Sequence, residues 1–153
     1  MKNSKLKLEM IRIIEAQNSD LPHLRKLFLN ERRRTFADQD ISQFKLEDFD
    51  KQTQGEYILI AHVDNIPIGF ISIWLPNNFI HHLYVDHKHQ GQNIGTELLK
   101  AAISKTNFPL TLKCVENNSK AIHFYLKKGF VEKSRGNSSN GSYILFELTN
   151  DVK

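Results

Sequence analysis

The sequence predicts a mixed α/β fold, in which antiparallel hairpins at both ends flank a central strand-helix-strand unit. Apolar runs at Tyr57–Val63 and Ile66–Leu75 flank a two-residue Asp-Asn turn, and a second turn-rich loop precedes the C-terminus. Between these hairpins, the apolar runs Phe79–Val85 and Leu110–Val115 enclose a helical pattern. Such a unit places its two strands parallel with a right-handed crossover, so we expect a mixed sheet.

The other elements are indicated by local signals. Ile11–Ala16 is apolar enough for a first strand, and Asn18-Ser19-Asp20 supplies capping side chains for the helix that follows. A shorter helix is expected over residues 46–53, and a further one over Ser119–Lys128. The closing hairpin is expected to pair residues 130–134 with 143–148 around the loop between them.

Length and composition fit one domain. The chain has 153 residues, of which 40% are hydrophobic and 25% charged, enough for one substantial core. We expect a single domain over residues 11–150, preceded by a flexible polar extension at residues 1–10. No run approaches about 18 consecutive apolar residues, and the basic N-terminus lacks an apolar signal region. A cytoplasmic protein without a membrane partner is therefore expected.

Charge and cysteine content narrow the function classes. The net charge of +4 is compatible with nucleic acid but equally with phosphorylated or acidic small ligands, and we expect no dedicated nucleic-acid role. The one cysteine, Cys114, excludes an internal disulfide. It lies in the apolar run Leu110–Val115, where burial is expected, and we assign it no catalytic role.

A small-residue turn after Phe79–Val85 predicts an anion site. The turn and the start of the next helix consist of Gln90, Gly91, Gln92, Asn93, Ile94, Gly95 and Thr96. Backbone N–H groups at a helix start have no intrahelical partner, and with the helix dipole they favour a negative charge in front of them. We therefore expect this phosphate loop, residues 90–96, to bind a phosphorylated cofactor.

Three runs of sequence resemble the GNAT acetyltransferase superfamily. They are Leu83 to Asp86, Gln90 to Gly95, and Asn118 through Tyr125 to Phe130, and the element order matches from about Ile11 to Leu148. The resemblance implies a mostly antiparallel sheet of about seven strands with about four helices, and a V-shaped cleft between the fourth and fifth strands. It also implies transfer of an acetyl group from acetyl-CoA to a primary amine, without a metal.

The resemblance assigns cofactor-binding roles. Main-chain groups of Leu83, Tyr84 and Val85 would pair with the pantetheine arm of CoA, Asn118 would contact the same arm, and residues 90–96 would hold the pyrophosphate. This chain departs from the family pattern at Asn93, where the first motif glycine is usual. Asparagine is the non-glycine residue that best tolerates a positive φ, so we expect the turn to form.

The chemistry requires two proton transfers. The acceptor ammonium must lose a proton before it attacks the thioester, and the leaving thiolate needs a proton donor. The residue that matches the family's acid is Tyr125. For the base we choose His81, because side chains of a strand alternate and only one of His81 and His82 is expected to face the substrate. His82, Lys113 on the next strand, or a water relay remain alternatives.

The sequence decides neither the identity of the amine acceptor nor the oligomeric state. The first two helices and their connection mix both charges, so they fit a polyamine or lysine as well as a carboxylate. The residues concerned are Glu31, Arg32, Arg33, Arg34, Asp38, Asp40, Glu47 and Asp48. The competing function is a non-catalytic acyl-CoA-binding sensor or regulatory module. The expected partner is an amine acceptor, and a homodimer is an option that the sequence does not decide.

Overall fold

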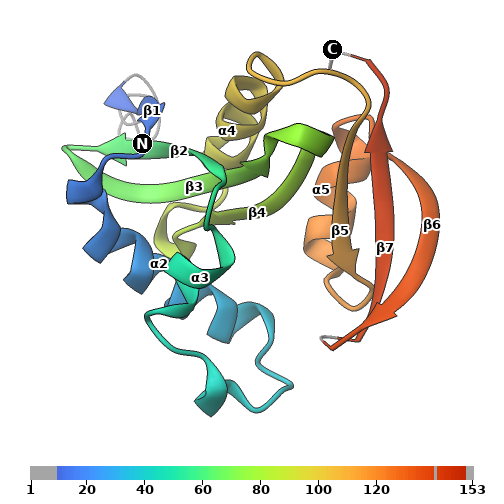
Figure 1. Ribbon diagram of the computed structural model, residues 1–153, viewed down its shortest axis with the longest axis horizontal. Coiled ribbons are helices and arrows are strands. Elements are labelled where there is room, and N and C mark those ends of the chain that lie inside the picture. Colours follow the sequence, from blue (N-terminus) through green and yellow to red (C-terminus); the bar gives the residue numbers. More distant parts are fainter. Residues whose placement is uncertain (1–9, 140, 151–153) are drawn as a thin grey trace.

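The computed structural model describes residues 10–139 and 141–150 of the chain. The predicted extension at residues 1–10 therefore lies outside the described residues except for Met10. Figure 1 shows the sheet running across the molecule, with the N-terminal strands on one side and the C-terminal hairpin on the other. Among the described helices, none combines the length and apolar character needed to span a membrane.

One seven-stranded sheet organises the fold. Its strands are β1 Arg12–Glu15, β2 Tyr57–Val63, β3 Ile66–Trp74, β4 Phe79–Val85, β5 Leu110–Val115, β6 Val131–Ser138 and β7 Gly141–Leu148. They follow the order β1-β2-β3-β4-β5-β7-β6. Every neighbouring pair is antiparallel except β4 and β5, which are parallel. The predicted mixed α/β fold is confirmed.

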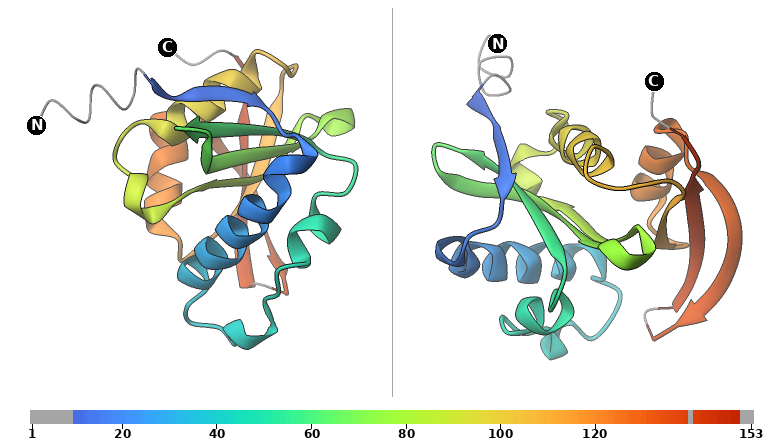
Figure 2. Two further views of the ribbon diagram at one scale, coloured as in Figure 1. Left: turned by 90° about the vertical axis from the view of Figure 1, so that its left-hand side faces the viewer. Right: turned by 45° about the horizontal axis from the view of Figure 1, so that its top comes forward.

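Two helical layers cover the sheet. The helices are α2 Leu21–Thr35, α3 Asp48–Gln52, α4 Ile94–Ile103 and α5 Ser119–Lys127. The apolar faces of α2 and α3 pack with β2 and β3 in one buried cluster, whereas α4 and α5 contribute to a second cluster on the other face, with residues of β2, β3, β4, β5 and β7. The two views of Figure 2 show α2 and α4 on opposite faces.

The cluster under α2 fixes the helix that borders the cleft. The rings of Phe28, Phe49 and Phe70 are almost fully buried and pack edge to face, with centroids 5.4 to 6.1 Å apart. Fully burying each such side chain contributes roughly 1.5–3 kcal/mol, before any gain from ring geometry. The C-terminal part of α2 is thereby held close to β4, where the functional residues lie.

The C-terminal hairpin is longer than predicted. Its strands pair through the stretch that was expected to be a loop, since Asn137 pairs with Ser142 and Ser138 with Gly141. Ser142 also donates a hydrogen bond of 2.8 Å to the side chain of Asn137. Turn-forming residues here tolerate strand geometry because β6 is an edge strand that is mostly exposed and buries little side-chain surface.

Candidate active site

The cleft opens where β4 and β5 part. Only Phe79 with Thr111 and Ile80 with Leu112 pair across these strands, so the rest of β4 has no strand partner on that side. Two cavities, of about 450 and 370 Å³, lie along the opening. We call them the loop cavity and the inner cavity. They share six lining residues, namely Thr35, Leu83, Tyr84, Asn118, Ala121 and Tyr125.

The phosphate loop has the geometry that the sequence predicted. Gly91 has φ +82°, and Asn93, which precedes α4, has φ +64°. A Cβ at position 91 would meet nothing within 4 Å, so glycine serves backbone conformation there rather than space. The carbonyl of Asn93 accepts the first helical bond from the N–H of Glu97, at 3.0 Å. Asparagine in the left-handed region thus keeps the turn intact.

Main-chain donors at the start of α4 face the loop cavity. The N–H groups of residues 91–96 make no hydrogen bond to other residues that the structure describes. They belong to residues that line the cavity, apart from Gln92. Free N–H groups and the positive end of the helix dipole together create a site for an anion such as a pyrophosphate.

Gln90 ties the loop to its surroundings. Its side-chain nitrogen donates to the carbonyl of Val85 at 3.0 Å, and its oxygen accepts from Nζ of Lys120 at 2.7 Å. Gln90 therefore joins the end of β4 to the start of α5 across the loop cavity. Val85 is also in register with Gly69 of β3.

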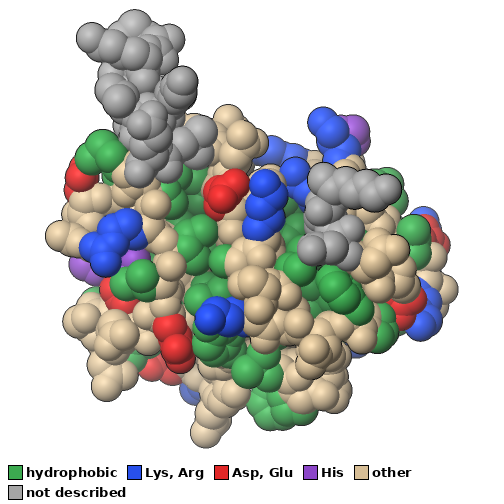
Figure 3. Space-filling view, turned by 90° about the horizontal axis from the view of Figure 1, so that it is seen from above, with side chains coloured by type: hydrophobic (Ala, Val, Ile, Leu, Met, Phe, Trp, Pro, Cys, Tyr) green, Lys and Arg blue, Asp and Glu red, His purple; other side chains and the backbone are tan. Residues whose placement is uncertain are grey.

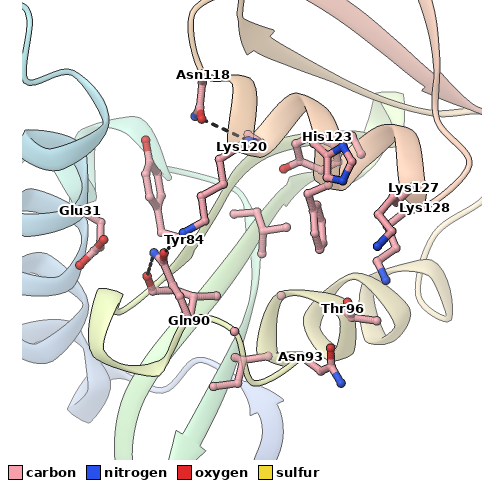
Figure 4. A pocket seen from close by; sticks show the side chains of 18 of the residues that line it. Glu31, Tyr84, Gln90, Asn93, Thr96, Asn118, Lys120, His123, Lys127 and Lys128 are labelled. Carbon is pink, nitrogen blue, oxygen red and sulfur yellow. Dashed lines mark hydrogen bonds between the residues drawn. The ribbon is translucent and has the colours of Figure 1, made fainter.

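A basic rim on α5 was missed by the sequence reasoning. Lys120, His123, Lys127 and Lys128 line the loop cavity, as does His89 of the preceding turn. Figure 4 shows the α5 side chains projecting around the same cavity as Asn93 and Thr96. The three-, four- and seven-residue spacing of these basic residues along one helix was the available signal. Because cations attract phosphates, the rim adds to the field of the free N–H groups.

Asn118 caps α5 at the junction of the two cavities. Its side-chain oxygen accepts a hydrogen bond of 3.2 Å from the N–H of Ala121, which caps α5. The side chain borders both cavities, and its carboxamide nitrogen makes no hydrogen bond to any residue described. The contact of Asn118 with the pantetheine arm stays a prediction. The carboxamide nitrogen is the atom that would make this contact.

Tyr125 lies where the two cavities meet. The residue is 8% exposed and packs edge to face against Phe124 and Phe130. Within the described chain its hydroxyl has no hydrogen-bond partner. Burial, and to a lesser degree the nearby Cys114 and Tyr84, raise the pKa of Tyr125 well above its ordinary value. The phenol therefore keeps its proton at neutral pH and has a free O–H donor.

A β-bulge changes the orientation of the two histidines. Ser72 pairs with His82 and Ile73 with Ile80, so His81 is an extra residue without a partner on β3. The His81 and His82 rings stack, with centroids 3.8 Å apart, and both line the inner cavity. The expectation that alternation lets only one of them face the cleft is therefore wrong. The bulge removes the alternation on which it depended.

The two histidines nevertheless differ in environment. His82 is buried between Ser72, 2.9 Å from Nδ1, and Gln52, 3.2 Å from Nε2. Burial, with the charges of His81 and Arg32, lowers the pKa of His82 to about 2. His81 is exposed, and its Nδ1 lies 2.6 Å from Oε2 of Glu56. Of the pair, His81 is the one whose remaining nitrogen is open to substrate.

Glu56 was not identified from the sequence. It lies between α3 and β2, 25 residues before His81, and its side chain is 7% exposed. Its second oxygen, Oε1, is buried and lacks a hydrogen-bond partner within the described chain. No local motif marks this position, so only the folded structure brings the carboxylate to the histidine.

Three further side chains with ionisable groups line the inner cavity. Cys114 is buried, as predicted, and burial raises the pKa of its thiol to about 11, which fits the absence of a catalytic role. Lys113 lines the same cavity from the exposed side of β5. Arg32 lines it from α2.

Two groups of side chains hold possible metal-ligand atoms within 4.8 Å of one another. They are Glu56, His81 and His82, and Glu31, Asp86 and His87. Hydrogen bonds explain both groups, since Glu56 bonds His81, and Glu31 accepts from the ring and the main-chain N–H of His87 at 3.0 and 3.1 Å. The second group joins α2 to the turn before the phosphate loop.

Comparison with known proteins supports this picture. The family model described as an acetyltransferase (GNAT) domain matches residues 13–145. The chain belongs to the GNAT acetyltransferase family. Membership confirms the sequence-based resemblance, and with it acetyl-CoA as the co-substrate of an acetyl transfer. No curated protein matches the chain.

Solved structures share the fold of this GNAT chain. A GCN5-related N-acetyltransferase from Rhodopseudomonas palustris is 23% identical, with 91% of this chain and 95% of that chain covered and a TM-score of 0.73. YjaB from Escherichia coli, in its apo form, is 20% identical over 90% and 96%, with a TM-score of 0.74. PaiA N-acetyltransferase from Thermoplasma acidophilum, solved with coenzyme A, is 21% identical over 90% and 99%, with a TM-score of 0.71.

Proposed function

We propose that this protein transfers the acetyl group of acetyl-CoA to a primary amine by direct attack, with Tyr125 as the acid toward the CoA thiolate. The observation that carries the proposal is the meeting of the two cavities at Tyr125. One cavity ends at free main-chain donors suited to a pyrophosphate, and the other holds a hydrogen-bonded histidine. A thioester that reached from the first cavity would present its carbonyl carbon to an amine in the second.

The loop cavity is the proposed CoA site. Residues 90–96 would hold the pyrophosphate through N–H groups, and the basic rim of α5 would add positive charge. Main-chain groups of Leu83, Tyr84 and Val85 would bind the pantetheine arm. This part of β4 does not pair with β5, so its edge toward the cleft has no neighbouring strand. Asn118 would contact the same arm. The proposed set of cofactor residues is therefore the one expected from sequence.

His81 is the proposed base. The amine nitrogen must lose a proton to form its bond to the carbonyl carbon, and that proton would pass to Nε2 of His81, directly or through water. Glu56 holds Nδ1 at 2.6 Å. A carboxylate acceptor there favours the tautomer with hydrogen on Nδ1, which leaves Nε2 unprotonated and free to accept. Glu56 would thus act as a positioning residue.

Tyr125 would complete the transfer. As the tetrahedral intermediate collapses, the carbon–sulfur bond breaks and the electron pair leaves on sulfur. The Tyr125 hydroxyl has a free hydrogen to donate to that sulfur. Its raised pKa makes it a hydrogen-bond donor first and a full proton donor only if the thiolate is poorly stabilised otherwise. The products would be CoA and an N-acetylated amine.

A thiol-release assay with acetyl-CoA and a panel of amines tests this function. The panel contains polyamines, amino acids, aminoglycosides and a peptide with a free N-terminus. Amine-dependent release of CoA, with an N-acetyl product found by mass spectrometry, would support transfer. Binding of acetyl-CoA without release with any amine would favour the non-catalytic sensor instead.

A further inference from the structure

The charge of the inner cavity bears on the identity of the acceptor, and this inference rests on the proposed acetyl transfer. Its cationic lining residues are Arg32 and Lys113, which come from opposite walls, α2 and β5. Among the described residues, no aspartate or glutamate lines this cavity. The acceptor end of the cleft is therefore lined by positive and neutral groups only.

The acidic side chains of the nearby helices and connection are engaged elsewhere. Asp38 accepts from the side chain of Asn117 at 3.1 Å, and Asp40 accepts from the N–H of Ser42 at 3.2 Å. Glu31 lies in the loop cavity, where it bonds His87. None of these three carboxylates lines the inner cavity, and Asp48 approaches it only through its bond to Arg32.

Arg32 is held in a fixed orientation. Its guanidinium carbon lies 4.7 Å from the centre of the Phe28 ring and 4.1 Å from that of Phe44. Nη1 bonds Asp48 at 3.1 Å, and in the described part of the chain Arg32 makes no other hydrogen bond. Its side chain is 11% exposed. Stacking and one carboxylate fix the plane of the group and leave Nε and Nη2 as unused donors.

Lys113 provides the second charge. It is exposed on β5, and its Nζ lies 4.8 Å from the centre of the Tyr143 ring. No carboxylate in the described residues forms an ion pair with it, whereas Asp48 balances Arg32. The lining therefore carries a positive charge on Lys113 that no carboxylate of the described residues offsets. His82, with its pKa near 2, is uncharged, and the Glu56 carboxylate, which does not line the cavity, is held by His81.

We infer that the acceptor is an amine that also carries an anionic group, a carboxylate or a phosphate, which binds between Arg32 and Lys113 while its amine faces His81. Two oxygens of either group match the free donors of a fixed guanidinium. A polyamine would instead place further cations beside Arg32 and Lys113 without a carboxylate to receive them. Acceptors such as amino acids or phosphorylated amines are favoured over polyamines.

Matched acceptor pairs test this inference. Each amino acid of a panel is compared with its decarboxylated amine, O-phosphoethanolamine with ethanolamine, and all with spermidine, by kcat/KM in the thiol-release assay. At least one anionic acceptor should exceed its neutralised partner by about tenfold or more, since a charge-assisted contact is lost. A preference in the carboxylate pairs or in the phosphate pair identifies the group. Equal values in all pairs, or spermidine as the best substrate, would overturn the inference.

Variants connect the preference to the site. Lys113→Gln should reduce the ratio of kcat/KM for the anionic acceptor to kcat/KM for its neutralised partner by about threefold or more. Lys105→Gln removes the same charge from an exposed position after α4 that lines neither cavity, and should keep the ratio. An unchanged ratio in Lys113→Gln would remove Lys113 from the site. Failure of every amine would instead contradict the proposed acetyl transfer itself.

Discussion

The two cavities are built by different parts of the chain. The loop cavity depends on main-chain groups of one continuous segment, residues 90–96, with Gly91 and Asn93 in left-handed conformations. The inner cavity depends on side chains from α2, α3, β4, β5, α5, β6 and β7. A main-chain site requires only a local turn, so many sequences can make it. A side-chain site requires specific residues on several elements, so one substitution can change it.

The removal of the Tyr125 hydroxyl has the largest expected effect, because it acts where the cavities meet. Tyr125→Phe keeps the ring packing against Phe124 and Phe130. We expect kcat to fall on the order of a hundredfold, the range of general acid catalysis, with the Kd of acetyl-CoA changed less than about twofold. Stopped-flow thiol release and calorimetry measure the two quantities. A normal kcat would exclude Tyr125 from the mechanism.

Disruption of the Glu56 and His81 pair affects the inner cavity alone. We expect Glu56→Gln to lower kcat about tenfold, because the tautomer of His81 is no longer fixed, and to leave acetyl-CoA affinity unchanged. In a double-mutant cycle, Glu56→Gln should cost little once His81 is already asparagine. Independent, additive losses would show that Glu56 acts on folding rather than through His81. The nitrogen-15 NMR shifts of His81 report its tautomer directly.

The phosphate loop can be altered without touching the inner cavity. Asn93→Val places a β-branched residue at φ +64°, at a cost of roughly 1–2 kcal/mol, and should weaken acetyl-CoA binding about tenfold. Asn93→Gly relieves that restriction and should bind within about twofold of the native chain. Calorimetry of both variants provides the comparison. Equal affinities for valine and glycine at this position would show that the loop does not hold the cofactor.

The smallest effect concerns stability at acid pH and belongs to His82. Its pKa is lowered from 6.5 to about 2, chiefly by burial. The His82 ring therefore stays unprotonated in the folded state at a pH where it takes up a proton in the unfolded chain. Stability from this group is complete above pH 6.5 and falls as the pH drops below it. Between about pH 7.5 and about 5.5, we expect the loss to be about 1 kcal/mol.

Denaturant unfolding at the two pH values measures that loss. His82→Gln has no titrating ring and should show a pH dependence smaller by this amount. His89→Gln is a control, because that histidine lies outside the inner cavity in the turn before the phosphate loop. An identical pH dependence in the native chain and His82→Gln would indicate that His82 is charged in the fold.

The surface charge does not distinguish the surroundings of the two cavities. Lys and Arg side chains occur in several places on the face shown in Figure 3, interspersed with hydrophobic side chains. The positive side chains that give the net charge of +4 are therefore not gathered at one place on this face. The charge that matters to the proposal is the pair formed by Arg32 and Lys113, which comes together only in the fold.

The local geometry of the phosphate loop was predicted from the sequence. Residues 90–96, the parallel pairing of β4 with β5 and the tolerance of Asn93 for a positive φ all follow from local signals. Turn chemistry and hydrophobic periodicity act over a few residues, so they can be recognised without a structure. The capping of α5 by the Asn118 side chain was not predicted, although an asparagine directly before a helix is a signal of the same local kind.

The side-chain half could not be predicted in the same way. The bulge at His81 results from pairing with Ser72 and Ile73 on β3, and no residue near His81 signals it. Glu56 reaches His81 from 25 residues away, and the packing of α2 brings Arg32 to the same cavity as Lys113. Such contacts depend on tertiary structure, which local patterns do not encode.

A bisubstrate analogue tests most directly whether the two cavities form one catalytic site. Coenzyme A is linked through its sulfur and an acetyl spacer to the nitrogen of the best acceptor found in the panel. If both halves bind at once, calorimetry should show a Kd at least about a hundredfold below that of acetyl-CoA, with one analogue per chain. Affinity no better than that of acetyl-CoA would contradict the continuous site on which the proposed transfer depends.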